Sequence, residues 1–173
     1  HPTDDDPVFK HLLQASRDLD LVVGFVDEDS RHRFYIASAY LSGGRVLHVH
    51  HKVYLPTYGL FDEGRFFAWG DSIQAFDTRF GRVGLLICED FWHPALSYVL
   101  AMQGIHALIV MAAAPGRGAL AGGEAGAFFA SSDSWERIAR TTAQLYGVYV
   151  VLCNRAGVEG GEQQGGGDQF NAA

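Results

Sequence analysis

The sequence predicts a layered α/β fold, and two observations support this prediction. Segments of helical periodicity alternate with short apolar runs typical of strands. Two pairs of these runs are separated by glycine-containing turns of the hairpin type. With 173 residues, 48% of them hydrophobic, the chain can bury one sizeable core but is too short to indicate two. We expect a single domain over residues 1–173. We also expect it to be incomplete at both ends, because the chain starts abruptly at His1 and closes in a glycine-rich stretch.

The first part of the chain is predicted to form a helix, a strand and a hairpin. Apolar side chains at helical spacing predict a helix over residues 8–18, and the apolar run over 19–26 predicts a strand. Residues 33–41 and 46–52 flank a Ser-Gly-Gly-Arg turn, which predicts two antiparallel strands.

A long connection follows over residues 53–71. It contains Pro56, three glycines and six aromatic residues, so it is unusually apolar for a surface loop. Loops of this length in compact domains are commonly functional. From its aromatic side chains we expect a closed, fairly apolar pocket.

A second hairpin leads into the most chemically interesting part of the chain. Strands are predicted at 73–78 and 82–87, and the second runs directly into Cys88. A helix over 94–103, ended by a glycine, and a buried strand over 105–112 follow.

The remaining elements are a Gly/Ala-rich segment, a helix and a last strand. Residues 115–126 are expected to be mobile because of their small side chains. The helix is predicted over 131–146, with Ser132 or Ser134 as its cap, and the strand over 148–154.

Charge and composition argue against two classes of partner. The formal net charge is -7 and Lys and Arg do not cluster, so a nucleic-acid backbone or an anionic membrane finds nothing to bind. No apolar run approaches the ~20 residues that cross a bilayer, and no signal peptide opens the chain. The two cysteines lie in apolar strand-like runs rather than in a disulfide framework, which favours a reducing cytoplasm.

Cys88 is a candidate nucleophile because an apolar strand ends there and a polar turn begins. Such a position holds a side chain rigidly while exposing it to a substrate, and a helix N-terminus lowers the pKa of a thiol. The alternative is a buried structural cysteine. Cys153 is expected to be of that structural kind, since no chemically active residues surround it.

Lys52 is notable because the chain has only two lysines against eleven arginines. A lysine at the end of an apolar strand indicates a site that needs a compact point charge. The alternative explanation is compositional bias with one accidental lysine.

The neighbouring histidines His48, His50 and His51 raise the question of a metal site. Zinc needs three or four ligands, and no cysteine pair or His-Glu helix completes such a set, so we expect no metal. Beside Cys88, Glu89 and Asp90 are candidate general bases, but for Asp90 a simple helix-terminal charge is the favoured interpretation.

Three motifs stand in a specific order and spacing along the chain. They are Lys52-Val53-Tyr54-Leu55-Pro56, then Phe61-Asp62-Glu63 with Gly70, and then Leu86-Ile87-Cys88-Glu89-Asp90-Phe91-Trp92. With these motifs, and with Trp135 and Asn154-Arg155-Ala156-Gly157 further on, the chain resembles the carbon–nitrogen hydrolase (nitrilase) superfamily from about Val22 onward.

The resemblance implies a fold and a chemistry. Members of this superfamily fold as a four-layer α-β-β-α sandwich and hydrolyse nitriles, amides or carbamoyl compounds through a Glu-Lys-Cys triad. By this resemblance Cys88 is the nucleophile, Lys52 the triad lysine and Glu63 a second glutamate that orients the site. A thioester would form on Cys88, with the oxyanion held by Lys52 and the backbone N–H of Glu89. Neither a metal nor an organic cofactor is implied.

The triad glutamate has no match in this chain. In the family it lies on a strand upstream of the matched segment, and Glu28 falls too late. We therefore expect that the residues carrying it are missing from this sequence. The alternative is a non-catalytic binding or scaffold protein that retains the fold.

Within the superfamily, residues 54–63 and 88–92 are most similar to the glutaminase domains of glutamine-dependent NAD synthetases. The residues matching Tyr58 and Glu89 touch glutamine there, and with Phe61 they are the predicted substrate-binding residues. Those domains carry Ala-Ser-Pro where this chain has Ala113-Ala114-Pro115, which lacks a substrate-holding hydroxyl.

Several functions are compatible with these motifs, and we rank them. A stand-alone amidase acting on a small-molecule amide is the first expectation, and a glutaminase domain supplying ammonia to a synthetase is the second. A nitrilase proper is disfavoured because Glu-Asp, not Trp-Glu, follows Cys88. An acyltransferase is disfavoured because those relatives are commonly attached to membrane spans. The family assembles through its helices, so we also expect a homo-oligomer.

Overall fold

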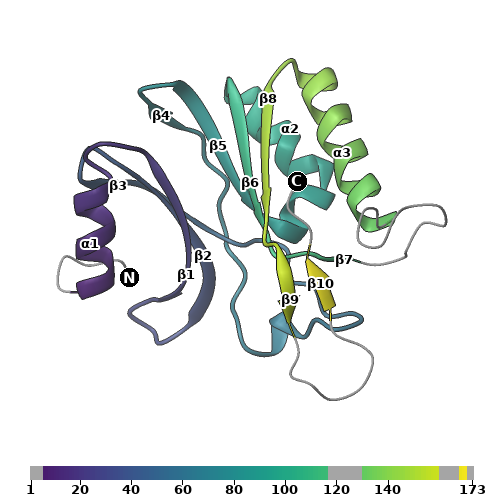
Figure 1. The fold of residues 1–173 in the computed structure, drawn as a ribbon, viewed down its shortest axis with the longest axis horizontal. Helices are drawn as coiled ribbons and strands as arrows, with labels where there is room; N and C mark the ends of the chain where they lie inside the picture. The colour runs from purple at the N-terminus through teal and green to yellow at the C-terminus, as the bar shows by residue number, and fades with distance from the viewer. Residues whose placement is uncertain (1–5, 117–129, 160–167, 171–173) are drawn as a thin grey trace.

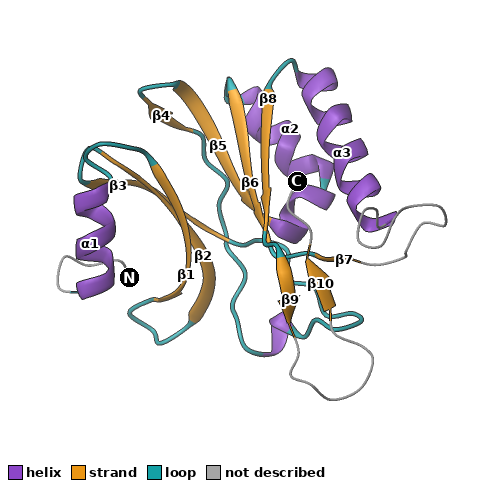
Figure 2. Cartoon of the chain, in the orientation of Figure 1, coloured by secondary structure: helices purple, strands orange, loops and turns teal. Residues whose placement is uncertain are grey.

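The computed structural model describes residues 6–116, 130–159 and 168–170. These residues form four layers in the order helix, sheet, sheet, helices (Figure 1). The predicted α-β-β-α sandwich is confirmed. Figure 2 shows the two sheets facing each other, with α1 outside one of them and α2 and α3 outside the other. No helix among the described residues is long and apolar enough to span a bilayer.

The first sheet is an antiparallel meander covered by one helix. Its strands are β1 (Leu21–Glu28), β2 (Phe34–Ser42) and β3 (Arg45–His51), in that order. Helix α1 (Pro7–Ala15) is capped by the Asp6 side chain, which accepts hydrogen bonds from two backbone N–H groups of the first turn. Its Phe9 packs with Ala39 and Leu41 in a small core between helix and sheet.

The second sheet is mixed and carries the site. Its order is β4 (Phe76–Thr78), β5 (Gly81–Ile87), β6 (Ala107–Ala112) and β8 (Tyr149–Asn154). Strands β5, β6 and β8 are parallel, with Ile87 opposite Met111 and Met111 opposite Cys153. The carboxyl ends of these strands therefore lie at one edge, where α/β folds commonly bind ligands.

Two helices cover the outer face of the second sheet. They are α2 (Pro94–Met102) and α3 (Ala130–Tyr146), and two single-turn 3₁₀ elements, η1 (Glu63–Arg65) and η2 (Cys88–Trp92), lie in the connections. The main core lies between these helices and the sheet, and Leu86, Phe91, Leu100, Leu108, Val110 and Trp135 are among its buried members. A small third sheet joins β7 (Pro115–Gly116), β10 (Asp168–Phe170) and β9 (Gly157–Glu159).

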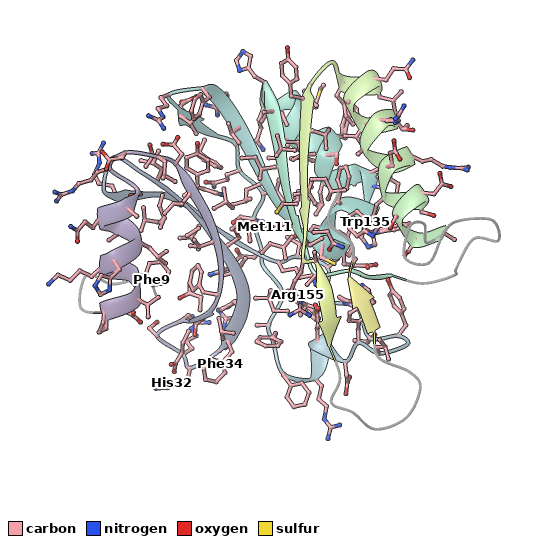
Figure 3. All side chains as sticks on the ribbon, viewed as in Figure 1. Phe9, His32, Phe34, Met111, Trp135 and Arg155 are labelled. Atoms are coloured by element: carbon pink, nitrogen blue, oxygen red, sulfur yellow. The ribbon has the colours of Figure 1, made fainter. Side chains whose placement is uncertain are left out.

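The two large sheets contact each other through both polar and aromatic side chains. The Ser38 hydroxyl donates to the Met111 sulfur at 3.0 Å, and Met111 lies between the sheets in Figure 3. On the same interface His48 stacks on Phe76 with ring centroids 4.4 Å apart, and Tyr40 meets Phe76 edge-on at 5.2 Å. These contacts hold the two sheets against each other.

Most predicted elements are confirmed, with shifted ends. The first helix ends at Ala15, because the Ser16 hydroxyl bonds back to the Leu13 carbonyl in the C-terminal turn. The strand predicted at 73–78 begins only at Phe76. Ser132 and Ser134 lie inside α3, so the prediction that one of them caps it is wrong. Of the segment 115–126, only Pro115 and Gly116 are among the described residues.

The interpretation of Cys153 as a buried structural cysteine is wrong. Its side chain is exposed, because β8 is an edge strand of the described sheet and alternate residues of it point out of the core. The apolar run around Cys153 predicted a strand but could not predict which side of it is covered.

Candidate active site

Cys88 lies at the carboxyl end of β5, at the first residue of a 3₁₀ turn. Its backbone has φ of 46°, a left-handed conformation that is uncommon for a residue other than glycine. Strained backbone of this kind persists only where the surroundings hold it, and it clusters at functional sites. The preceding strand is largely buried, so the turn presents the Cys88 side chain at a fixed place with partial access to solvent.

Lys52 and Glu63 form a close ion pair. The Lys52 ammonium lies 2.8 Å from one carboxylate oxygen of Glu63 and 2.6 Å from the other. The Lys52 side chain is 2% exposed and that of Glu63 is 20% exposed. A lysine this deeply buried requires a partner charge, and Glu63 supplies it. The structure thus brings two of the three predicted catalytic residues into direct contact.

The backbone around Lys52 is held on both sides. Its N–H donates to the Ile36 carbonyl at 2.8 Å, and its carbonyl accepts from the Gly70 N–H at 2.7 Å. Gly70 is required there, because a Cβ atom would lie 2.2 Å from the carbonyl oxygen of His51. The loop 53–71 therefore returns to the end of β3 and packs against the residue that precedes Lys52.

Burial dominates the electrostatics of the Cys88 thiol. Burial raises the pKa of Cys88 above its ordinary value, while the Lys52 charge and a hydrogen bond from the backbone of Ala113 act in the opposite direction. The pKa of the thiol is therefore raised, whereas the sequence suggested a lowered one. The turn after Cys88 is a five-residue 3₁₀ helix, too short to offset the loss of water around the sulfur.

Burial also raises the pKa of Glu63, with the hydrogen bond and charge of Lys52 opposing the shift. Glu63 thus binds a proton more readily than an exposed glutamate does. This makes its carboxylate more basic than usual, which suits a residue that accepts or relays a proton.

A cavity of about 120 Å³ opens over Cys88. Four of the six predicted site residues line it, namely Cys88, Glu89, Tyr58 and Phe61. The rest of its wall is largely apolar, with Pro56, Trp92, Ala114, Pro115 and Trp135. An apolar cleft with a few convergent polar groups is the usual form of a small-molecule site. Lys52 and Glu63 pair with each other and are not among the lining residues.

Glu89 is the acidic group of this cavity, and neighbouring side chains hold it in place. The Tyr58 hydroxyl donates to one of its oxygens at 2.7 Å, and Nε2 of His93 lies 3.6 Å from the other. The His93 ring is itself stacked on Tyr54, with centroids 3.4 Å apart. This arrangement holds a carboxylate in the wall of the cavity, and a carboxylate binds N–H donors and cations.

The aromatic loop forms less of the pocket than expected. Of its six aromatic residues only Tyr58 and Phe61 line the cavity, whereas Phe66 and Trp69 are 66% and 73% exposed. The predicted apolar character of the pocket is confirmed, but the loop supplies fewer of its aromatic side chains than its sequence suggested. The loop contributes two aromatic side chains to the cavity, and the other two come from η2 (Trp92) and from α3 (Trp135, labelled in Figure 3).

Asp90 is more than a helix-terminal charge, contrary to the sequence interpretation. It is completely buried and accepts hydrogen bonds from three backbone N–H groups and from His50. Sequence reasoning missed this role because an aspartate near a helix start is usually exposed. The one available signal was that the adjacent Phe91 and the preceding strand are strongly apolar.

Asn154 is a second residue whose role was not identified from sequence. At the end of β8 its side-chain amide accepts from the Ala114 N–H at 2.8 Å and donates to the Ala114 carbonyl at 3.0 Å. It thereby holds the segment after β6, whose Ala113 backbone reaches the Cys88 thiol. A polar residue at the end of an apolar, strand-like run was the available signal.

The three histidines and Glu28 have other contacts. His50 bonds Asp90, His51 bonds Asp27 at 2.7 Å, and His48 stacks on Phe76. Within the described residues no group of three His, Cys, Asp or Glu side chains is arranged to hold a metal ion. Glu28, the last residue of β1, pairs with the exposed His32 and is not part of the Lys52–Glu63 group.

Similarity to known proteins identifies the family of this chain. The family model described as carbon-nitrogen hydrolase matches residues 2–168. The chain belongs to the carbon-nitrogen hydrolase family. The predicted resemblance is therefore confirmed, and the motifs at Lys52, Glu63 and Cys88 all lie inside the matched segment.

Curated relatives of this carbon-nitrogen hydrolase chain fall into two groups. The glutamine-dependent NAD(+) synthetase of Thermotoga maritima is 37% identical over 108 residues, covering 60% of this chain and 18% of that protein. The N-carbamoylputrescine amidase of Arabidopsis thaliana is 25% identical over 172 residues, covering 98% of this chain and 56% of that protein. The chain thus spans about a fifth to a little over half of the length of these relatives.

Solved structures show the same fold. A glutamine-dependent NAD+ synthetase from Acinetobacter baumannii, in complex with ADP, has a TM-score of 0.76 at 26% identity, covering 95% of this chain and 28% of that one. A carbon-nitrogen hydrolase from Helicobacter pylori has a TM-score of 0.80 at 23% identity, covering 96% and 57%. The second comparison concerns the fold alone.

Proposed function

We propose that this carbon-nitrogen hydrolase chain carries the nucleophile of an amidase that acts on a small-molecule amide. The observation that carries the proposal is Cys88, held at a strained turn on the floor of a cavity, with the buried Lys52–Glu63 pair acting on its thiol. Burial raises the pKa of this thiol and the Lys52 charge opposes the rise, and a cation beside a cysteine is a general means of favouring the thiolate nucleophile.

In the proposed reaction, the Cys88 sulfur attacks the amide carbon while its proton passes to a base. The carbonyl oxygen becomes an oxyanion stabilised by the Lys52 ammonium and the Glu89 backbone N–H. Breaking the carbon–nitrogen bond releases ammonia or an amine, which takes up the proton, and leaves a thioester on Cys88. Water then cleaves the thioester with general-base assistance, releasing a carboxylic acid and restoring the thiol.

Glu89 supports a substrate that carries a hydrogen-bond donor or a positive charge near the reacting amide. Its carboxylate lines the cavity beside Cys88, and Tyr58 and His93 orient it. The substrate would place its acyl portion against the apolar lining of the cavity and direct a donor group at Glu89.

A glutaminase domain that supplies ammonia to a synthetase is the second candidate. It is favoured by the 37% identity to the Thermotoga maritima synthetase over 108 residues and by the hydrogen bond between Tyr58 and Glu89 in the cavity. Ala114 offers no hydroxyl to a substrate at the cavity wall, which favours the amidase instead.

We further propose that the protein is a cytoplasmic homo-oligomer. Its free cysteines support the cytoplasmic location, and exposed apolar residues on α2 and α3, such as Met102 and Leu145, support the oligomer.

Intact-mass spectrometry after brief mixing with glutamine, citrulline, N-carbamoylputrescine and simple amides tests the proposal. An acyl adduct that peptide mapping places on Cys88 is expected for the true substrate, and its mass separates the two candidates. Cys88→Ala should abolish turnover with the fold intact, whereas the matched control Cys153→Ala should retain both. Equal loss of activity in the two variants would contradict the assignment of Cys88 as the nucleophile.

Lys52→Arg should also be inactive, because a planar guanidinium cannot replace a compact ammonium at a position where the lysine side chain is 2% exposed. Steady-state ammonia release measures this directly. Near-normal release by the arginine variant would show that Lys52 does not contact the oxyanion.

A further inference from the structure

One buried carboxylate connects the segment that carries Lys52 to the turn that carries Cys88. Asp90 is 0% exposed. Its Oδ1 accepts from the backbone N–H of Val53 at 3.0 Å and of Tyr54 at 2.9 Å. These two residues follow Lys52 directly, so the Asp90 carboxylate fixes the chain just after the lysine.

The second oxygen of Asp90 contacts the strands β5 and β3. Oδ2 accepts from the Ile87 N–H at 3.2 Å, directly before Cys88. It also accepts from Nε2 of His50 at 2.8 Å, and His50 is itself 3% exposed. His50 lies two residues before Lys52, so the carboxylate contacts the chain on both sides of the lysine.

We propose that Asp90 and His50 are positioning residues that set the Lys52 ammonium relative to the Cys88 thiol. We call this pair the Asp90–His50 clamp. The inference rests on the proposed function only for its catalytic meaning, since the geometry it describes is present in the folded chain without a substrate.

A carboxylate is needed for this connection because four donors converge on it. Two oxygens without hydrogens can accept from Val53, Tyr54, Ile87 and His50 together. An asparagine has one acceptor oxygen, so its NH₂ group would face N–H donors on one side and lose two of the bonds. His50 also places a donor against the buried charge, which would otherwise be costly.

The direction in which Asp90→Asn moves the pKa of the Cys88 thiol distinguishes the clamp from a simple loss of charge. The Lys52 charge lowers the pKa of the Cys88 thiol against the larger effect of burial, while Glu63 and Glu89 act to raise it. If Asp90→Asn only removed a negative charge near Cys88, the thiol pKa would fall. If it displaces Lys52, the thiol pKa rises.

The experiment measures the rate at which iodoacetamide alkylates Cys88 as a function of pH. The full chain is used without substrate, and peptide mapping separates Cys88 from Cys153. For Asp90→Asn we expect the midpoint of the rate–pH curve, which reports the thiol pKa, to rise by about half a pH unit. At a pH below the midpoint, this shift makes alkylation about threefold slower. In a Lys52→Met background the same change should leave the midpoint where Lys52→Met alone puts it, because the clamp acts through the lysine.

Two further variants keep the test decisive if Asp90→Asn does not fold. His50→Leu removes one donor and should move the midpoint in the same direction, whereas His50→Gln retains a donor and should restore it. Asp20→Asn is the matched control, because the Asp20 carboxylate accepts from Tyr40 and Ser42 at 2.6 Å each and contacts neither site segment. It should lower stability without moving the midpoint.

A fall in the midpoint for Asp90→Asn, or an equal shift with and without Lys52, would overturn the clamp. So would an unchanged midpoint in both Asp90→Asn and His50→Leu. Because alkylation needs no substrate, failure to find a hydrolysed amide would refute the proposed function while leaving this result interpretable.

Discussion

Glu63→Gln is expected to destabilise the fold more than Lys52→Met, although each variant removes the same ion pair. The asymmetry follows from burial. The Lys52 side chain is 2% exposed, so without Glu63 its ammonium has neither a partner charge nor water. The Glu63 side chain is 20% exposed and its pKa is already raised by burial, so without Lys52 it can take up a proton or turn toward water.

The size of the difference can be set from these exposures. Breaking a buried ion pair by removing one partner costs about 3–5 kcal/mol, and the partial exposure of Glu63 places Glu63→Gln near the lower end, at about 3 kcal/mol. Lys52→Met leaves a neutral, apolar side chain of similar length in the buried site and should cost about 1 kcal/mol or less. A loss of about 3 kcal/mol corresponds to a fall of roughly 6–12 °C in Tm for a chain of this size.

Urea unfolding of the full chain measures the effect, with both single variants and the double variant compared at pH 7. The double variant should be close in stability to Lys52→Met, because Glu63→Gln no longer leaves a charge unpaired once the lysine is gone. Equal destabilisation by the two single variants, or a larger cost for Lys52→Met, would refute the assignment of Lys52 as the desolvated partner.

Two other changes test the packing around the site and the sheet interface. Gly70→Ala should cost about 3 kcal/mol or more and reduce activity, because its Cβ would lie 2.2 Å from the His51 carbonyl oxygen and push the chain at Lys52 out of place. Thermal unfolding measures this change, and a stability loss below about 1 kcal/mol would contradict the close approach. His48 is held neutral because burial, with the charge of His50, lowers its pKa from 6.5 to about 4. The unfolded chain therefore binds the proton more readily between these pH values, so the free energy of unfolding should fall as pH drops through that window. Allowing for partial exposure, the loss is about 1–2 kcal/mol. His48→Phe keeps the ring on Phe76 and should remove that part of the pH dependence in urea titrations at pH 4 and 7; an unchanged slope would refute it.

Local signals were sufficient for the elements and for the main site residues. The Gly43-Gly44 turn and the Gly81 turn mark hairpins because these residues adopt positive φ, a conformation that glycine reaches without the steric cost that other residues incur. The glycine that ends α2 and the apolar run of β5 likewise indicate a helix end and a buried strand from the local sequence. Cys88 at the end of β5 and Lys52 at the end of β3 follow from these boundaries, and motif spacing linked them to Glu63.

Only the tertiary structure shows which side chains are buried and which groups they contact. The rise in the pKa of Cys88 comes from residues packed around it, and no neighbour in sequence reports that packing. The exposure of Cys153 depends on β8 being an edge strand of the described sheet, and the role of Asp90 depends on donors from β3 and β5 meeting at one point. The chain itself determined which residues stand at the ends of strands. Only the stacking of the two sheets determined which of them lose water and which charges they meet, because desolvation and Coulomb energy depend on distance in space and not along the sequence.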